Sequence, residues 1–213
     1  MKETLTLEDF VPLLETIAAA LQAENEQITA LDAAMGDGDL GVTCRLGMQA
    51  ALDSEAKNAD NPADALLKAG MAFNSAGAST FGALVATVAM RAAKYAKDNG
   101  IAQWDLPGLI GAGEAALAGL KQRGGADVGD KTMLDALGPA LDALKAAHAA
   151  GKGLAEALGD AAQAAEEGAR STAPLKAKFG RAGWLQEQTV GVQDPGATVV
   201  AVVAGALAEY ASQ

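Results

Sequence analysis

The sequence predicts an all-α protein, and three observations support this fold class. Half of the 213 residues are apolar although only 4% are aromatic, and alanine, the strongest helix former, supplies much of the apolar fraction. Apolar residues recur at helical spacing, as in Phe10, Leu13, Leu14 and Ile17. Helix start and stop signals recur along the chain, whereas strand-rich folds favour β-branched and aromatic residues.

Local signals set the boundaries of the expected helices. Thr6-Leu7-Glu8-Asp9 resembles a capping box, with Asp in place of Glu or Gln. Asn61-Pro62 and Asp105-Leu106-Pro107 each combine a capping residue with a proline in the first turn, and Asn99-Gly100 is a C-terminal stop signal. The expected helices cover about residues 10–21, 24–31, 41–57, 62–73, 79–99, 105–124, 132–150, 154–171 and 197–210.

Helices of this length, joined by short connections, indicate an up-and-down antiparallel bundle, and abundant Ala and Gly would let the helices approach closely. No domain linker interrupts the sequence, so residues 1–213 are expected to form a single domain. The alternative is a doubly wound α/β fold in which residues 198–203 form a strand. We favour a helix there because Ala204 to Glu209 continue the run at helix length.

Composition argues against several classes of function. The net charge of -11 and the pI near 4.5 would repel nucleic acid and anionic lipid. One cysteine, Cys44, excludes internal disulfides and a cysteine-based zinc site. The start of the sequence lacks a signal-peptide pattern, and no 18-residue apolar stretch is free of charge. We therefore expect a soluble cytoplasmic protein with no nucleic-acid or membrane partner.

One connection places three acidic side chains, Asp32, Asp37 and Asp39, among glycines that let the backbone fold tightly. Converging carboxylates repel one another unless a cation lies between them, and oxygen-only ligation suits Mg²⁺ or Ca²⁺. An EF-hand is excluded because Val42 and Met48 occupy its glycine and glutamate positions. The alternative is an acidic loop whose carboxylates stabilise a helix N-terminus.

Two further connections are rich in glycine at a helix start. Ser79 and Thr80 follow Gly77, where they could bind a phosphate or where Ser79 could simply cap the helix. The segment 124–133 nearly matches a P-loop, but Asp130 separates the glycine from the lysine and no buried strand precedes it. A Walker fold is therefore rejected, and the segment is interpreted as a turn capped by Asp130 or Thr132.

The longest connection, residues 176–196, carries Arg181 and Trp184. Long loops in compact domains are often functional, so Arg181 could contact a phosphate and Trp184 could stack or pack; the alternative is an ordinary packed loop. The single histidine, His148, is expected on a solvent-facing helix position. Without an evident base or nucleophile, such a site suits phosphoryl transfer, which needs mainly positioning and charge neutralisation.

Four stretches together are more specific than any one alone: GDGDLGVT (36–43), GASTFGAL (77–84), GDKTMLDAL (129–137) and GRAGWLQEQTVGVQDPGAT (180–198). In this order they resemble the nucleotide-binding L subunit of the dihydroxyacetone kinase family, which is also the C-terminal domain of single-chain dihydroxyacetone kinases. The resemblance implies an eight-helix antiparallel up-and-down α-barrel, closed by the nucleotide at one end. It covers nearly the whole chain.

The resemblance also implies roles for individual residues. Asp32, Asp37 and Asp39 would hold two Mg²⁺ ions that bridge the phosphates of ATP or ADP, and Arg181 would act on the transferring phosphate as the catalytic residue. The implied nucleotide-binding residues are Leu40, Gly41, Val42, Thr43, Ala78, Ser79, Thr80, Gly124, Met133, Arg181, Asp194, Pro195 and Gly196.

In the family the substrate is bound covalently to a histidine of a separate K subunit or domain. The chain is therefore expected to be the nucleotide-binding half of a kinase for dihydroxyacetone or a related short ketose, and to form a homodimer. Two alternatives stay open: bound ADP that a phosphotransferase-system protein rephosphorylates, and a reporter of nucleotide state that binds a transcription regulator. Leu40, Thr43 and Gly183-Trp184 depart from the residues common in the family.

Overall fold

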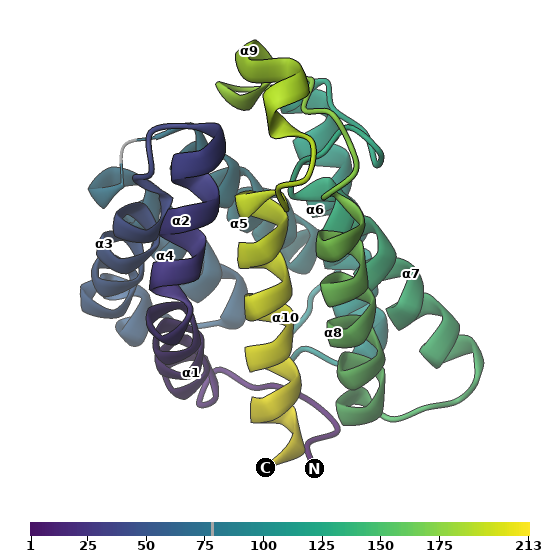
Figure 1. The fold of residues 1–213 in the computed structure, drawn as a ribbon. Coiled ribbons are helices and arrows are strands. Elements are labelled where there is room, and N and C mark those ends of the chain that lie inside the picture. The colour runs from purple at the N-terminus through teal and green to yellow at the C-terminus, as the bar shows by residue number, and fades with distance from the viewer. Residues whose placement is uncertain (78) are drawn as a thin grey trace.

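The computed structural model describes residues 1–77 and 79–213, and this part of the chain is almost entirely helical (Figure 1). Its α-helices are α1 (Phe10–Ala23), α2 (Asn25–Met35), α3 (Leu40–Asp53), α4 (Pro62–Ala76), α5 (Thr80–Asp98), α6 (Leu106–Gly124), α7 (Leu134–Ala149), α8 (Leu154–Ser171), α9 (Ala182–Leu185) and α10 (Pro195–Ser212). Short 3-10 helices cover Glu55–Asn58 and Gln186–Thr189. The predicted all-α class is confirmed.

The long helices form a closed ring. Figure 1 shows α2 stacked above α1, and because only Glu24 separates them they act as one rod of the ring. Each of the helices α3 to α8 packs against its neighbour in sequence, and α10 packs against both α8 and α1. Over the described residues this makes an antiparallel barrel of eight members, as the family resemblance implies, with α9 outside the ring.

Most helix boundaries follow the predicted signals. The side chains of Asn61, Ser79 and Asp105 each accept a hydrogen bond from the backbone N–H three residues later. The helix expected over 41–57 was too long: α3 ends at Asp53 because Ser54 adopts an extended conformation, and its hydroxyl then caps a 3-10 turn.

The structure differs from two sequence interpretations, one at residues 198–203 and one at residues 6–9. The strand considered for residues 198–203 is wrong, since these residues lie within α10. The capping-box interpretation of residues 6–9 is half right: the Asp9 carboxylate accepts from both the N–H and the hydroxyl of Thr6, but the Thr6 hydroxyl donates and the helix begins only at Phe10.

Small residues let neighbouring helices approach closely, as predicted. A Cβ added at Gly70 of α4 would overlap the side chain of Ala89 on α5. One added at Gly168 of α8 would overlap the backbone of α7 at Asp135. Glycine at these two positions therefore sets the spacing of the α4–α5 and α7–α8 pairs.

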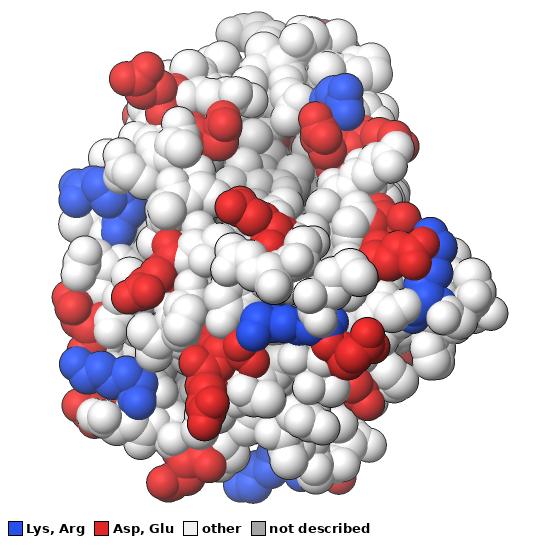
Figure 2. Space-filling view, turned by 90° about the horizontal axis from the view of Figure 1, so that it is seen from below, with Lys and Arg blue, Asp and Glu red and all other residues white. Residues whose placement is uncertain are grey.

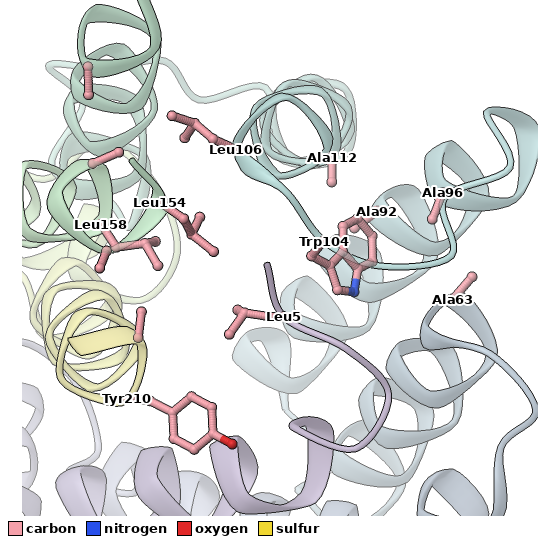
Figure 3. Packing of buried hydrophobic residues seen from close by; sticks show 14 of the residues in the cluster. Leu5, Ala63, Ala92, Ala96, Trp104, Leu106, Ala112, Leu154, Leu158 and Tyr210 are labelled. Atoms are coloured by element: carbon pink, nitrogen blue, oxygen red, sulfur yellow. The ribbon is translucent and has the colours of Figure 1, made fainter. Parts of the chain in front are cut away.

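One end of the barrel is plugged by the N-terminal segment. The backbones of Leu5 and Trp104 exchange two hydrogen bonds, of 2.8 and 2.7 Å, and Figure 3 shows Leu5 between Trp104, Leu154 and Tyr210. Seen from this end, acidic and basic side chains are scattered among uncharged ones (Figure 2). The plug leaves only the opposite end of the barrel open.

A buried polar contact fastens the plug to α10. The Asp9 carboxylate accepts hydrogen bonds from Lys2 at 2.7 Å and from the Tyr210 hydroxyl at 2.9 Å. Burial alone would raise the pKa of Asp9, but these bonds and those from Thr6 hold that pKa well below its usual range.

Among the described residues, α10 is the helix that is long and apolar enough to cross a membrane by length and composition. It lies in the barrel wall, where it packs against α8, α7 and α1.

Candidate functional site

The up-and-down topology brings the four motif-bearing connections to the open end of the barrel. Since successive members of the ring run in opposite directions, the α2–α3, α4–α5, α6–α7 and α8–α10 connections share one end, the upper one in Figure 1. Four helix N-termini, those of α3, α5, α7 and α10, meet there. Helix N-termini carry partial positive charge and free N–H groups, so this end is suited to an anion.

A cavity of about 430 Å³ lies between these connections, a size typical of small-molecule sites. Six apolar side chains of its lining, which we term the apolar wall, come from α2, α5, α6 and the start of α7: Met35, Phe81, Leu84, Leu120, Met133 and Leu134. The lining also includes most of the residues expected at the nucleotide: Asp32, Asp37, Asp39, Leu40, Ser79, Thr80, Gly124, Arg181, Asp194, Pro195 and Gly196. The cavity can therefore accept a flat apolar group against the apolar wall and a charged group beside the polar side chains.

The three acidic residues converge on one side of the rim. Asp32 lies in the last turn of α2, while Asp37 and Asp39 flank Gly38, whose φ of 74° is accessible mainly to glycine. One carboxylate oxygen from each aspartate lies within 4.8 Å of the other two. Asp32 also accepts from the backbone N–H of Leu40 at 3.0 Å. A set of three carboxylates at this spacing suits a hard divalent cation.

Some predicted site residues do not line the cavity. Gly41 and Thr43 are buried in the first turns of α3, and Val42 is exposed on its outer side. A side chain at Gly41 would overlap Thr29 of α2, so this glycine has a packing role. Ala78 lies outside the described residues.

The turn before α5 has a capping function as well as its place on the rim. The Ser79 hydroxyl accepts from the N–H of Gly82 at 3.0 Å, and a Cβ at Gly82 would overlap the carbonyl oxygen of Gly77. The capping interpretation of Ser79 is therefore confirmed, and Thr80 begins the helix beside the cavity.

The connection from α6 to α7 is folded by a buried acid. The Asp135 carboxylate accepts from the N–H groups of Gly129 and Thr132, at 2.6 and 2.8 Å. The Thr132 hydroxyl accepts from Leu134, as a cap would, whereas Asp130 pairs with Lys178 of the long loop. These contacts hold the start of α7, with Met133, against the cavity.

The long loop, which in the structure covers residues 172–194 between α8 and α10, contributes Phe179 to Ala182 and Asp194 to the cavity lining. Arg181 pairs with the Asp37 carboxylate across the cavity mouth. Trp184, at 84% exposed, neither packs nor lines the cavity, so its predicted packing role is wrong. Asp194 caps α10 by accepting from Ala197 at 2.7 Å, and burial raises the pKa of its carboxyl to about 7.

Sequence reasoning missed Lys131. Its side chain is 2% exposed and its ammonium donates to five backbone carbonyl oxygens of the long loop. Burial lowers the pKa of this ammonium, and the charge of Asp194 opposes that change. No local pattern signals such a contact, because all five oxygens lie more than 40 positions away in sequence.

Comparison with known proteins places the chain in a family. A family model described as the DAK2 domain matches residues 34–209. The chain is 33% identical over 178 residues to DhaL, the ADP-binding subunit of the PEP-dependent dihydroxyacetone kinase of Escherichia coli (strain K12), and covers 84% of it. It is 35% identical over 205 residues to an L-erythrulose 1-kinase of Mycolicibacterium smegmatis, but spans only 35% of that protein.

Solved structures extend the similarity to three dimensions. The dihydroxyacetone kinase of C. freundii matches with a TM-score of 0.72 and 29% identity, over 98% of this chain and 36% of that one. Its complex with AMP-PNP and Mg²⁺ matches with a TM-score of 0.71 and 28% identity, over 93% of this chain and 33% of that one. The chain thus spans about a third of these relatives. It belongs to the DAK2 domain family of kinases and is a domain of the dihydroxyacetone kinase L-subunit type.

Proposed function

We propose that the chain binds ATP or ADP with Mg²⁺ in the open-end cavity and serves as the nucleotide-binding subunit of a kinase for dihydroxyacetone or a related short ketose. The observation that carries this proposal is the arrangement of the cavity. Three carboxylates line the same cavity as the starts of α5 and α10 and the apolar wall. A nucleotide has the matching polarity, with a flat base at one end and phosphates at the other.

Asp32, Asp37 and Asp39 would hold Mg²⁺, and the donor set fits it because all the ligand atoms are carboxylate oxygens. The resemblance implies two ions. Bound there, Mg²⁺ would neutralise phosphate charge that three aspartates otherwise repel.

The chain's own residues would orient the nucleotide. The start of α3 (Leu40 to Thr43) and the start of α5 with its cap (Ser79 and Thr80) would offer backbone N–H groups to the phosphates. The resemblance also implies a phosphate contact for Ala78. Gly124 and Met133 would contact the base, and Asp194, Pro195 and Gly196 would complete the binding site. Because Gly41, Val42 and Thr43 do not line the cavity, any contribution from them is through the α3 backbone and not through side chains.

Arg181 would act on the transferring phosphoryl group. Its planar guanidinium can donate several hydrogen bonds to phosphate oxygens and offset developing charge. Its side chain is largely exposed, so it is free to leave Asp37 when the cavity fills. Contact between Arg181 and the transferring phosphoryl group therefore requires only that the Arg181 side chain moves, and the barrel need not rearrange.

The substrate would be held by a K subunit or domain. The only histidine of the sequence, His148, is exposed in the last turn of α7, at the other end of that helix from the cavity. It cannot tether a carbonyl substrate beside the phosphates. We further propose that residues 1–213 act as a single cytoplasmic domain and that two copies form a homodimer.

A second candidate is supported by the extent of the match to DhaL, which this chain covers over 84% of its length. In this alternative ADP stays bound and is rephosphorylated by a protein of the phosphotransferase system. Both candidates use the same cavity, and they differ in the source of the phosphate.

Incubation with a K subunit and dihydroxyacetone or erythrulose tests both. Ketose phosphate formed from free Mg-ATP supports the first candidate, whereas formation only with a phosphohistidine donor protein supports the second. If neither donor yields product and the chain binds neither ADP nor ATP in the presence of Mg²⁺, the proposed function is wrong.

A further inference from the structure

The Lys131 ammonium is enclosed by backbone oxygens. Its Nζ lies 2.5–3.4 Å from five carbonyl oxygens, which we term the carbonyl cage: those of Thr172, Ala173, Leu175, Thr189 and Val192. An ammonium has three N–H donors, so five acceptors share them. Among the described residues no carboxylate lies within ion-pair distance of this Nζ. The arrangement is that of a cation coordinated by carbonyl dipoles, as in ion-selective filters.

The carbonyl cage joins the two ends of the long loop. Three of its oxygens follow α8 and two precede α10, while the segment between them carries Arg181 and other residues of the cavity wall. Three of the oxygens also accept a backbone N–H: Thr172 from Leu175, Ala173 from Gly191 and Thr189 from Val192. Without a cation at the centre, five inward-facing carbonyl dipoles would repel one another, and the oxygens of Leu175 and Val192 would have no donor among the described residues. The ammonium thus offsets the electrostatic cost of bringing the two ends of the loop together.

Lys131 reaches the cage from a strained backbone position. Its φ is 60°, a left-handed conformation that is unfavourable for a residue with a side chain. The neighbouring residues, Thr132 and Met133, line the cavity. Lys131 therefore joins the turn before α7 to both ends of the long loop.

We infer that Lys131 is a positioning residue of the nucleotide site: a tethered cation whose carbonyl cage holds the Arg181 loop against the cavity. This inference rests on the proposed function. It predicts that the cage, once emptied, accepts a free cation of the same kind and regains its effect.

The test uses two variants and a matched control. Lys131→Met keeps most of the side-chain volume without the charge, and Lys131→Ala leaves room for propylammonium, the missing part of the side chain. Lys178→Met is the control, because Lys178 links the same two segments through Asp130, but at the exposed surface. Amide hydrogen exchange of residues 172–192 is measured without nucleotide, and Mg-ADP affinity is measured by calorimetry.

We expect faster exchange of residues 172–192 and a roughly 10- to 100-fold weaker Mg-ADP affinity in both Lys131 variants, with little change in Lys178→Met. In Lys131→Ala, propylammonium should restore much of the exchange protection and of the Mg-ADP affinity. It should not do so in Lys131→Met, where the side chain fills the space. Tetramethylammonium, which has no N–H, should restore neither protection nor affinity in either variant. Recovery of this kind separates positioning from a general structural role.

Unchanged exchange and affinity in Lys131→Met would overturn the inference, as would losses in Lys131→Ala that propylammonium does not repair. If the wild-type chain does not bind Mg-ADP, the proposed function fails. Exchange, which needs no nucleotide, then still decides whether the carbonyl cage holds the loop.

Discussion

Asp37→Asn should separate metal binding from folding more cleanly than any other single change. The substitution keeps the size of the side chain and removes one of three negative charges that lie within 4.8 Å of one another. It also removes the ion pair with Arg181, in which the Asp37 side chain is 42% exposed. The two losses act in opposite directions on the metal-free protein.

At 4.8 Å in water, two carboxylates repel by about 0.9 kcal/mol, so removing one of three relieves about 2 kcal/mol. Loss of the exposed ion pair costs about 0–1 kcal/mol. The metal-free variant should therefore melt within a few degrees of the wild type, and on the higher side. A Mg²⁺ ion about 2.1 Å from a carboxylate oxygen gains about 4 kcal/mol at the same dielectric constant. Since Asn keeps a carbonyl oxygen, we expect between half of this gain and all of it to be lost, which lowers the Mg-ADP affinity roughly 25- to 700-fold.

The affinity is measured by calorimetry at fixed Mg²⁺, and the melting temperature by circular dichroism without Mg²⁺ or nucleotide. Asp142→Asn is the matched control, because this acid is exposed on α7 away from the cavity. Equal Mg-dependent affinity in Asp37→Asn and wild type would refute the metal assignment. A large loss of stability without metal would show that Asp37 serves folding instead.

Three further predictions follow from the site. Arg181→Lys should leave the melting temperature nearly unchanged and lower turnover with a K subunit at least about tenfold, because lysine keeps the charge but loses the planar fork; a much lower melting temperature with normal turnover per folded molecule would contradict this. The purified chain alone should not phosphorylate dihydroxyacetone, and robust ketose phosphate formation without a second subunit would refute the half-enzyme proposal. Burial raises the Asp194 pKa from 3.8 to about 7, so between these pH values the folded protein keeps a proton that the unfolded chain releases, and the free energy of unfolding falls as the pH rises. Urea titrations over this pH range should show that Asp194→Asn removes this part of the pH dependence. An equal dependence of the free energy of unfolding on pH in both proteins would show that the carboxyl titrates normally.

Local sequence signals predicted the fold because each helix carries its own start. Asn61, Ser79 and Asp105 cap their helices by accepting from the N–H three residues later, and such a short-range contact can be predicted from the neighbouring sequence alone. The long loop was harder, since its short helix Ala182–Leu185 has no buried residue to mark an apolar face. The helix expected over residues 41–57 was too long because the helical spacing of apolar residues outweighed Ser54, a residue type that favours caps and turns.

The parts of the site that could be predicted are those whose residues lie close together in the sequence. The acidic turn and the Asp194-Pro195-Gly196 start of α10 are short motifs with a chemical meaning of their own. The apolar wall is not, because Met35, Phe81 and Leu120 come from three helices and are indistinguishable in sequence from core residues. The Lys131 contacts depend on tertiary closure of the long loop, which no local pattern encodes.

A crystal structure with AMP-PNP and Mn²⁺ in place of Mg²⁺ tests the central claim most directly, because Mn²⁺ is located by its anomalous scattering. The account predicts nucleotide in the open-end cavity, its base on the apolar wall, and anomalous peaks beside Asp32, Asp37 and Asp39. Nucleotide bound elsewhere, or Mn²⁺ absent from these three carboxylates in crystals that contain the nucleotide, would contradict it.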